Sequence, residues 1–256
     1  MISIVKVDSA QLEKEFVLFP FKLYKGCEYW VPPIISEELD SMNKVKNPVF
    51  KNAEAEFYLA KKNGITVGRI AAIVNWVEIE EQKKNKLRFG WYDTIDDVDV
   101  SKKLLEQVID FGKKRKLDFI DGPVGFSNMD KAGLLIEGYE ELNTMITWYH
   151  YPYQKKHLEQ LGFTKLAEWV EYKIKIFSAE DAPEKVKKFS KIIQKRYELK
   201  VVNFKSKKEI IPYVDKMFEL LNVTYSNLQT FVTIKQYQID FYKEKFIKYI
   251  HPDFIK

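Results

Sequence analysis

The sequence has 256 residues, of which 46% are hydrophobic, so it can bury the core of one large domain or two modest ones, and disorder is excluded. Its 42 basic and 37 acidic residues leave a net charge of +5, spread along the chain, which argues against a nucleic-acid partner. Cys27 is the single cysteine, which excludes an internal disulfide and a paired-cysteine metal site, so we expect no bound metal. We find neither a signal peptide nor a run of about 18 apolar residues, and therefore expect a soluble, cytoplasmic protein with no membrane partner.

The first third of the chain predicts a strand, a helix and a hairpin. Residues 2–7 alternate apolar and polar side chains as a strand does. Ser9 can cap the helix that follows, and we expect Pro20 to interrupt that helix. Strands are predicted at 55–61, 66–76 and 87–92, the first two joined by a tight turn at Asn63 and Gly64, which both tolerate positive φ. A charged connection at 78–86 leads into the third strand.

The middle of the chain predicts a crossover unit. Val100, Leu104, Val108 and Phe111 form the apolar stripe of an amphipathic helix, with Asp99 as its expected N-cap. A short strand at 117–122 follows and should run parallel to the strand before the helix. We then expect a loop at 127–143, a short helix at 153–161 and a long strand at 165–177.

The remainder of the chain predicts helices at 183–197, 206–226 and 233–249. We therefore divide the chain into an α/β domain, residues 1–180, and a helical region, residues 181–256. The apolar faces of these helices must pack on the first domain or on another chain, so we expect a helical subdomain that either docks on the first domain or mediates a homodimer.

The order of these elements, together with several short phrases, resembles the GNAT superfamily of acyl-CoA-dependent N-acyltransferases. The phrases lie at 21–26, 30–33, 122–123, 130–138 and 158–163. They are most similar to a poorly characterised bacterial subgroup with a second GNAT-like half, of which we expect residues 183–256 to be a truncated beginning. The resemblance implies an α/β (α+β) fold with a mixed, mostly antiparallel central sheet flanked by helices, plus the C-terminal helical region.

The resemblance also implies a reaction, the transfer of an acyl group such as acetyl from acyl-CoA to a small-molecule or peptide amine. In the superfamily two strands splay at a bulge to admit the pantetheine arm, and N–H groups at the start of the crossover helix hold the pyrophosphate. The residues placed against acetyl-CoA or another acyl-CoA are Trp91, Tyr92, Thr94, Ser101, Lys102 and Lys103.

The expected phosphate loop, residues 94–101, departs from the family pattern. It contains no glycine or arginine but carries Asp96, Asp97 and Asp99, which should repel a pyrophosphate unless Lys102 and Lys103 outweigh them. The three acids could hold a cation or an amine, or simply complement the start of a helix. The chain therefore has an alternative reading, a GNAT-fold binding or interaction module with lost or weakened CoA binding and no acyl transfer.

Candidate catalytic and substrate residues follow the same resemblance. Asp130 or Glu137 could take the amine proton, although both could be ordinary loop acids. The usual catalytic tyrosine is replaced by Leu158, so Tyr151 and Tyr153 are the candidates for protonating the thiolate. The expected substrate-binding residues are Ser127, Asn128, Trp148 and Tyr149, and the aromatic run at 148–153 could equally be core packing. His157 could be a general acid or a surface histidine.

Overall fold

The computed structural model describes residues 1–175, 178 and 180–255, and the chain forms two compact units. The first unit comprises Met1–Glu168 and Thr224–Ile234, and the second comprises Trp169–Val223 and Lys235–Lys256. The predicted boundary after residue 180 falls inside the second unit. Residues 224–234, which join two helices of the tail, belong to the first unit.

A five-stranded sheet in the order β1-β2-β3-β4-β5 forms the centre of the first unit. Its strands are β1 (Ile2–Lys6), β2 (Ala53–Lys62), β3 (Ile65–Asn75), β4 (Lys86–Thr94) and β5 (Phe119–Asp121). All neighbours are antiparallel except β4 and β5, which are parallel as the predicted crossover requires. The turn between β2 and β3 uses Asn63 and Gly64, both at positive φ. The expected mixed, mostly antiparallel sheet is confirmed.

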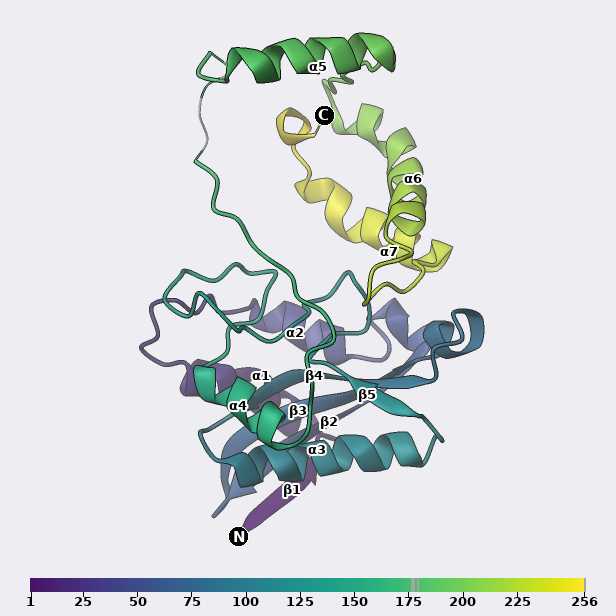
Figure 1. Ribbon diagram of the computed structural model, residues 1–256. Helices are drawn as coiled ribbons and strands as arrows, with labels where there is room; N and C mark the ends of the chain where they lie inside the picture. Colours follow the sequence, from purple (N-terminus) through teal and green to yellow (C-terminus); the bar gives the residue numbers. More distant parts are fainter. Residues whose placement is uncertain (176–177, 179, 256) are drawn as a thin grey trace. The chain divides into compact units, whose positions relative to one another are not determined.

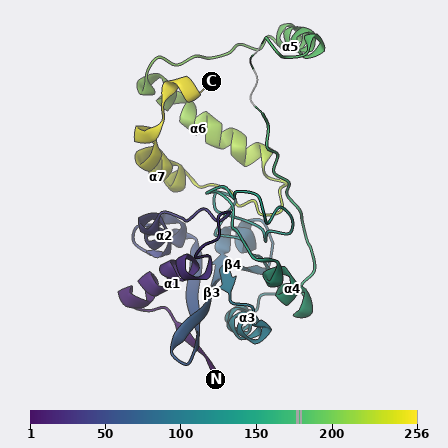
Figure 2. The ribbon, with the colours of Figure 1, turned by 90° about the vertical axis from the view of Figure 1, so that its left-hand side faces the viewer.

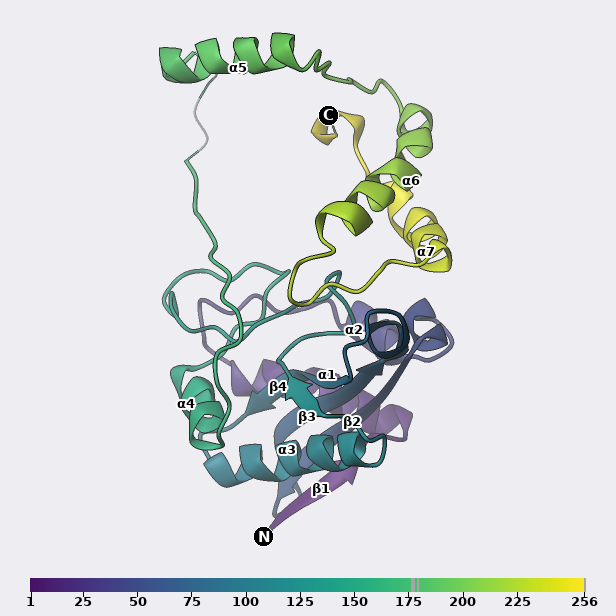
Figure 3. The same ribbon diagram turned by 45° about the vertical axis from the view of Figure 1, so that its right-hand side comes forward.

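Two pairs of helices cover the two faces of this sheet. Helices α1 (Ala10–Leu23) and α2 (Ile35–Met42) lie on one face, and α3 (Val98–Lys113) and α4 (Pro152–Gln160) on the other (Figures 1 and 2). Each face has its own apolar cluster: Phe16 of α1 and Met42 of α2 belong to one, Leu104 of α3 and Leu158 of α4 to the other. Figure 3 shows α3 running along the lower face of the sheet. A 3-10 turn (Pro48–Lys51) precedes β2, and a π-helical turn, η2 (Val77–Glu81), connects β3 to β4.

Two helix predictions were wrong in detail. Helix α1 continues through Pro20 instead of being interrupted there. A proline has no N–H for the carbonyl four residues earlier, and here that carbonyl, of Phe16, accepts a hydrogen bond from Arg69 Nη1 at 3.0 Å. The N-cap of α3 is Asp97, not Asp99, because the Asp97 side chain accepts from the Asp99 N–H at 3.1 Å.

The predicted strand at 165–177 was wrong as far as the structure describes it. Residues 165–175 form neither helix nor strand, and 176 and 177 lie outside the described residues. Apolar alternation alone does not make a strand, because the backbone needs a ladder partner. Residues 165–175 have no such partner, and Trp169 and Val170 stay exposed.

The second unit contains the predicted helices of the tail: α5 (Glu184–Arg196), α6 (Lys207–Thr224) and α7 (Gln236–Phe246), followed by two 3-10 turns (Ile247–Tyr249 and Pro252–Phe254). Helices α6 and α7 contact each other, since Phe218 stacks on Tyr242 with centroids 5.9 Å apart, and Asp215 pairs with Lys243. Within the described residues, no helix is both long and apolar enough to cross a bilayer.

Candidate active site at the open half of strand β4

Strand β4 pairs with β5 only at its start and with β3 from Arg88 onward. Residues 86–88 pair with β5, whereas the register against β3 shifts at Ile70, where Trp91 and Tyr92 form a bulge. Trp91 has a φ of 47°, an uncommon conformation for a bulky side chain and one often found at functional sites. The bulge and the divergence of β4 from β5 leave the second half of β4 without a neighbouring strand on that side. This opening is the splay that the resemblance implies.

Side chains, instead of a strand, bond the carbonyls of this open half. Tyr153 donates its hydroxyl proton to the Thr94 carbonyl at 2.7 Å, and Gln154 Nε2 donates to the Tyr92 carbonyl at 3.3 Å. The buried His150 ring lies near the Tyr92 backbone and accepts from the Leu135 N–H at 3.3 Å. A side chain can rotate away from its acceptor more easily than a strand can leave a sheet. The carbonyls of Tyr92 and Thr94 are therefore hydrogen-bonded in this structure. A ligand that displaced the side chains of Tyr153 and Gln154 could donate hydrogen bonds to the same two carbonyls.

A buried polar group behind this edge joins α1 to β3 and β4. Arg69 Nε donates to Asp93 Oδ2 at 2.7 Å, and Tyr24 donates its hydroxyl proton to Asp93 Oδ1 at 2.6 Å. The Tyr24 oxygen is also 3.0 Å from the Tyr149 carbonyl oxygen. Burial and the Asp93 charge raise the pKa of Tyr24 well above its usual value, so it stays protonated. This group fixes the segment 149–154 against β4.

Replacing Tyr24 by phenylalanine is expected to lower the free energy of unfolding of the first unit by about 1–3 kcal/mol, because Asp93 loses a buried donor. Urea unfolding followed by tryptophan fluorescence measures this loss. The control is Tyr139→Phe, whose hydroxyl bonds only a part-buried carbonyl and should matter less. An equal loss in both variants would contradict the assignment.

A hydrogen-bonded chain runs from the interior to the surface at the start of α3. Tyr92 donates its hydroxyl proton to Ser101 Oγ at 2.8 Å, Ser101 Oγ is 2.9 Å from His157 Nδ1, and His157 Nε2 is 3.2 Å from Asp96 Oδ1. Ser101 is fully buried, whereas the Asp96 side chain is 71% exposed. A nucleophilic serine needs the opposite arrangement, an accessible hydroxyl and an enclosed acid. His157, expected on the surface, is buried here.

The N-terminal end of α3 already carries a carboxylate. Asp97 caps the helix and also pairs with Lys62 at 3.2 Å, and this cation helps to lower the pKa of Asp97 below its usual value. The hydroxyls of Thr94 and Ser101 point into the interior, 3.3 Å apart. Lys102 and Lys103 are exposed, and Lys103 pairs with Glu106. A pyrophosphate at this helix end would have to displace or tolerate the Asp97 charge.

The bulge presents its aromatic side chain to the α1–α2 face. Trp91 packs against Trp148 with centroids 6.0 Å apart, and its Nε1 donates to Glu38 Oε2 at 2.7 Å. A Cβ at Gly90 would lie 2.5 Å from the Val124 carbonyl, so the residue must be glycine for residues 123–125 to cross β4 here. Lys131 is partly buried near Glu38, and burial lowers its pKa. The fold therefore brings Trp91 and Trp148 into contact, and they pack in the core next to the open half of β4.

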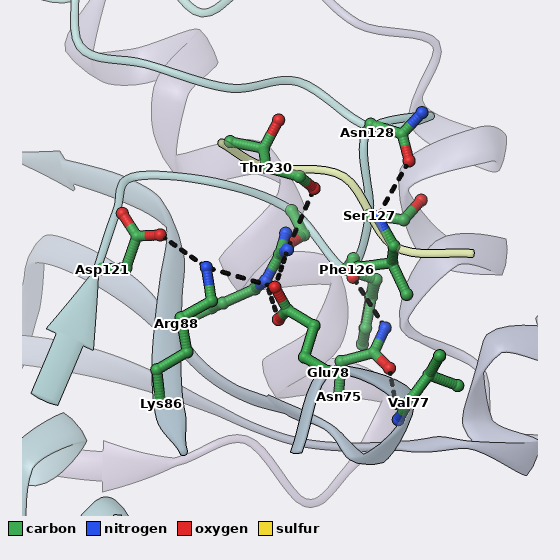
Figure 4. A network of polar contacts seen from close by, with 12 residues as sticks. Asn75, Val77, Glu78, Lys86, Arg88, Asp121, Phe126, Ser127, Asn128 and Thr230 are labelled. Atoms are coloured by element: carbon green, nitrogen blue, oxygen red, sulfur yellow. Dashed lines mark hydrogen bonds and ion pairs between the residues drawn. The ribbon is translucent and has the colours of Figure 1, made fainter. Parts of the chain in front are cut away.

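The turn at 127–130 lies beside a buried ion-pair network (Figure 4). Asp130 Oδ2 accepts from the Ser127 N–H at 2.9 Å, and Asn128 Oδ1 accepts from the Val232 N–H at 3.3 Å. Asp130 exposes part of its surface while its carboxylate is enclosed in the turn, and this enclosure raises its pKa to about 6. These side chains hold the turn and the 230–234 segment.

The centre of that network is Arg88, which is fully buried. Its Nε and Nη2 donate to the two carboxylate oxygens of Glu78 at 2.6 and 2.7 Å, and Nη2 also donates to the Thr230 carbonyl at 3.0 Å. Lys86 bridges Glu78 and Asp121 at 3.1 and 2.8 Å. The paired charges balance, as burial of charges requires.

The other predicted site residues lie toward the surface. Tyr149 and Tyr151 line a pocket of about 490 Å³ together with Lys25, Gly26, Cys27, Glu28, Tyr29, Tyr139 and Glu140. Tyr151 stacks on Tyr153 with centroids 5.6 Å apart, so this pocket adjoins the open half of β4. Glu137 is exposed on its loop. Within the described part of the chain, no cluster of His, Cys, Asp or Glu could hold a metal ion.

Sequence reasoning missed the polar groups that organise the site, namely Tyr24, Arg69, Asp93, His150 and Gln154. One signal was available for two of them. Arg69 and Asp93 are charged residues within strands that lie in the middle of the sheet, where an unpaired charge would be costly. Such a pattern indicates a buried ion pair, but the sequence does not say which charges meet.

Comparison with known proteins finds related chains but no matching protein-family model. Protein YghO of Escherichia coli (strain K12) is 27% identical over 244 residues, which cover 94% of this chain and 60% of that protein. The bacterial ceramide synthase of Caulobacter vibrioides is 26% identical over 174 residues, 67% of this chain and 45% of that protein. The chain thus spans about half the length of the curated relatives it matches.

A crystal structure from Clostridium acetobutylicum, described as a predicted acetyltransferase with acetyl-CoA, matches 68% of this chain and 96% of its own at 14% identity and a TM-score of 0.42. Independently of that match, the strands and helices from β1 to α4 follow the order that the GNAT resemblance implies, with α2 as an additional helix. The chain resembles the GNAT superfamily in its order of elements through α4.

Proposed function

We propose that this chain carries an acyl-CoA-dependent N-acyltransferase activity that moves an acyl group to an amine. The observation that supports it most directly is the open half of β4, where a bulge at Trp91 exposes two carbonyls that only side chains satisfy. The N–H groups of a pantetheine arm can replace the donors of Tyr153 and Gln154 there. The name of the Caulobacter vibrioides relative also describes a synthase whose product, a ceramide, is an N-acylated amine.

The transfer forms a bond from the amine nitrogen to the thioester carbonyl carbon and breaks the carbon–sulfur bond. One proton must leave the nitrogen and one must reach the thiolate. Tyr153 is our candidate donor to the thiolate, because its protonated hydroxyl lies at the open half of β4, where it donates to the Thr94 carbonyl. The candidate bases Asp130 and Glu137 stay predictions, as does Tyr151, because the Asp130 carboxylate holds the turn at 127–130 and Glu137 is exposed on its loop.

The pocket lined by Tyr149 and Tyr151 is our candidate entrance for the amine. It adjoins Tyr153, and its rim carries Glu28 and Glu140, whose charges outnumber that of Lys25. An ammonium group is attracted by carboxylates and by the faces of tyrosine rings. Ser127, Asn128 and Trp148 remain proposed substrate contacts.

One titration tests the proposal. Acetyl-CoA and octanoyl-CoA are titrated into the chain by calorimetry, and release of the CoA thiol is followed with short and long-chain amines. We expect saturable binding at micromolar acyl-CoA, and thiol release that requires an amine. No heat with either thioester up to millimolar concentration would refute the proposal.

The variant Tyr153→Phe should separate binding from chemistry. It frees the Thr94 carbonyl for the ligand, so acyl-CoA should bind at least as tightly as in the parent chain. Without the donor, kcat should fall by about 10²-fold or more. The control is Tyr249→Phe, a side chain of the second unit that is 74% exposed, and it should change neither quantity. Weaker acyl-CoA binding with unchanged kcat would contradict the role given to Tyr153.

A second function, a GNAT-fold binding module without acyl transfer, is favoured by one observation, the Asp97 carboxylate at the start of α3. Asp97→Ser keeps a capping oxygen and removes the charge. If that charge is what excludes the pyrophosphate, CoA affinity should rise about fivefold, corresponding to about 1 kcal/mol between charges 4 Å apart in water. An unchanged affinity would remove Asp97 as the reason for weak CoA binding.

A further inference from the structure

Helix α5 combines a strongly basic surface with an apolar stripe. Its basic residues are Lys185, Lys187, Lys188, Lys191, Lys195 and Arg196, against the single acid Glu184. Val186, Phe189 and Ile193 are spaced three and four residues apart and therefore share one face of the helix. At the same helical period Lys188, Lys191 and Lys195 lie on the opposite face.

The apolar stripe of α5 is exposed. Among the described residues, no α5 side chain is buried, and Val186, Phe189 and Ile193 expose 57%, 52% and 47% of their surface. Leu199 and Val201 extend the stripe and, with the helix, line a groove of about 680 Å³. Lys185 lies over the Phe189 ring, with Nζ 5.9 Å from its centroid. This exposed apolar surface is therefore bordered by cations.

We propose that α5, labelled in Figure 1, is an interfacial helix that lies flat on an anionic lipid bilayer. With 13 residues it rises about 20 Å, too short for a hydrocarbon core of about 30 Å, so it cannot cross. Lying in the interface, it would insert Val186, Phe189 and Ile193 among acyl chains while its lysines meet anionic headgroups. Lys185 and Arg196 flank the stripe and can extend to the headgroups while their stems remain apolar.

Charge complementarity selects this occupant over a second copy of the chain. Two α5 helices packed through their stripes would bring the flanking cations Lys185 and Arg196 of both copies together, which costs free energy. An anionic bilayer supplies an apolar layer and negative charge at one surface. This inference goes beyond the proposed function and does not depend on acyl transfer.

Vesicle co-sedimentation of the full chain tests the proposal. Vesicles of phosphatidylcholine alone are compared with vesicles containing 30% phosphatidylglycerol, without acyl-CoA or amine. We expect binding to the anionic vesicles at least tenfold stronger than to the neutral ones, weakening as NaCl is raised because salt screens the attraction.

Two variants and a control locate the binding. The first variant removes the apolar stripe by the double substitution Phe189→Ser with Ile193→Ser. The second variant reverses the charge of the basic face by the triple substitution Lys188→Glu with Lys191→Glu and Lys195→Glu. Both should weaken binding at least tenfold. The control is a triple variant at the end of α3, Lys113→Glu with Lys114→Glu and Lys116→Glu. It changes the net charge by the same amount as the triple variant in α5, and it should bind vesicles within about twofold of the parent chain. Circular dichroism confirms that each variant keeps its helix content.

Three outcomes would overturn the proposal. The chain fails to sediment with anionic vesicles, or the α3 variant loses binding as much as the α5 variant does. In the third outcome, the chain does not bind vesicles, and light scattering shows that it is a dimer. If the double variant Phe189→Ser with Ile193→Ser dissociates that dimer, the apolar stripe packs against a second copy of the chain.

Discussion

Replacing Arg88 by alanine is expected to lower the free energy of unfolding of the first unit by about 3 kcal/mol. Arg88 is fully buried and pairs with both carboxylate oxygens of Glu78, so its removal leaves a buried charge. Lys86 keeps one contact with Glu78, at 3.1 Å, which is why we expect the lower end of the usual cost of about 3–5 kcal/mol. The Thr230 carbonyl also loses its donor.

Urea unfolding of Arg88→Ala, followed by tryptophan fluorescence, measures this loss. The control is Lys46→Ala, which removes an ion pair with Asp40 whose side chains are 61% and 40% exposed. Exposed pairs contribute about 0–1 kcal/mol, so the control should change stability little. Arg88→Ala should also increase protease cleavage within 224–234, because that segment loses its bond to Arg88. Similar losses in the two variants would contradict a buried, paired role for Arg88.

Acidification is expected to destabilise the first unit through His150 by about 3 kcal/mol between pH 6.5 and pH 4. Burial lowers the pKa of this histidine from 6.5 to about 4, and Arg69 and Lys131 act in the same direction while Asp93 and the Tyr92 backbone oppose them. The folded state thus binds the proton less readily than the unfolded state. The stability is present above pH 6.5 and is lost as the pH falls through the folded-state pKa of about 4.

The variant His150→Gln isolates this contribution, because glutamine does not titrate but can still accept from the Leu135 N–H. Carboxylates titrate in the same interval in both proteins, so the readout is the difference between their stability curves from pH 7 to pH 4. We expect the parent chain to lose about 3 kcal/mol more than the variant over this interval. Parallel curves would show that His150 does not carry the acid sensitivity.

The arrangement around β4 shows which parts of the site were predictable. Tyr92, Thr94, Ser101 and Tyr153 were named from the resemblance, and the structure gathers them around the open half of β4. Their roles in binding and catalysis stay predictions. Ser127, Asn128 and Asp130 gather elsewhere, at the turn beside Arg88, where each makes bonds that hold the backbone. A resemblance identifies residues by their positions along the chain. It does not say which of them form hydrogen bonds that stabilise the fold and are therefore not available to a ligand.

Pro20 and Arg69 illustrate why local rules fail. A proline within a helix was expected to interrupt it, because it leaves a carbonyl without a donor. That carbonyl belongs to Phe16, and its donor is Arg69, 53 positions away. No window of sequence around Pro20 contains this information. The strand expected at 165–177 failed for the related reason that 165–175 have no ladder partner.

The sequence by itself determined the elements and their order, because hydrophobic period, turn residues and helix caps act over a few neighbouring residues. It predicted the hairpin at Asn63 and Gly64, the crossover from β4 through α3 to β5, and the helices of the tail. Only the tertiary structure decided which polar groups meet, since the bulge at Trp91 and the register of β3 against β4 set those distances. The bond from Arg88 to Thr230 joins residues 142 positions apart, and only the folded chain brings them together.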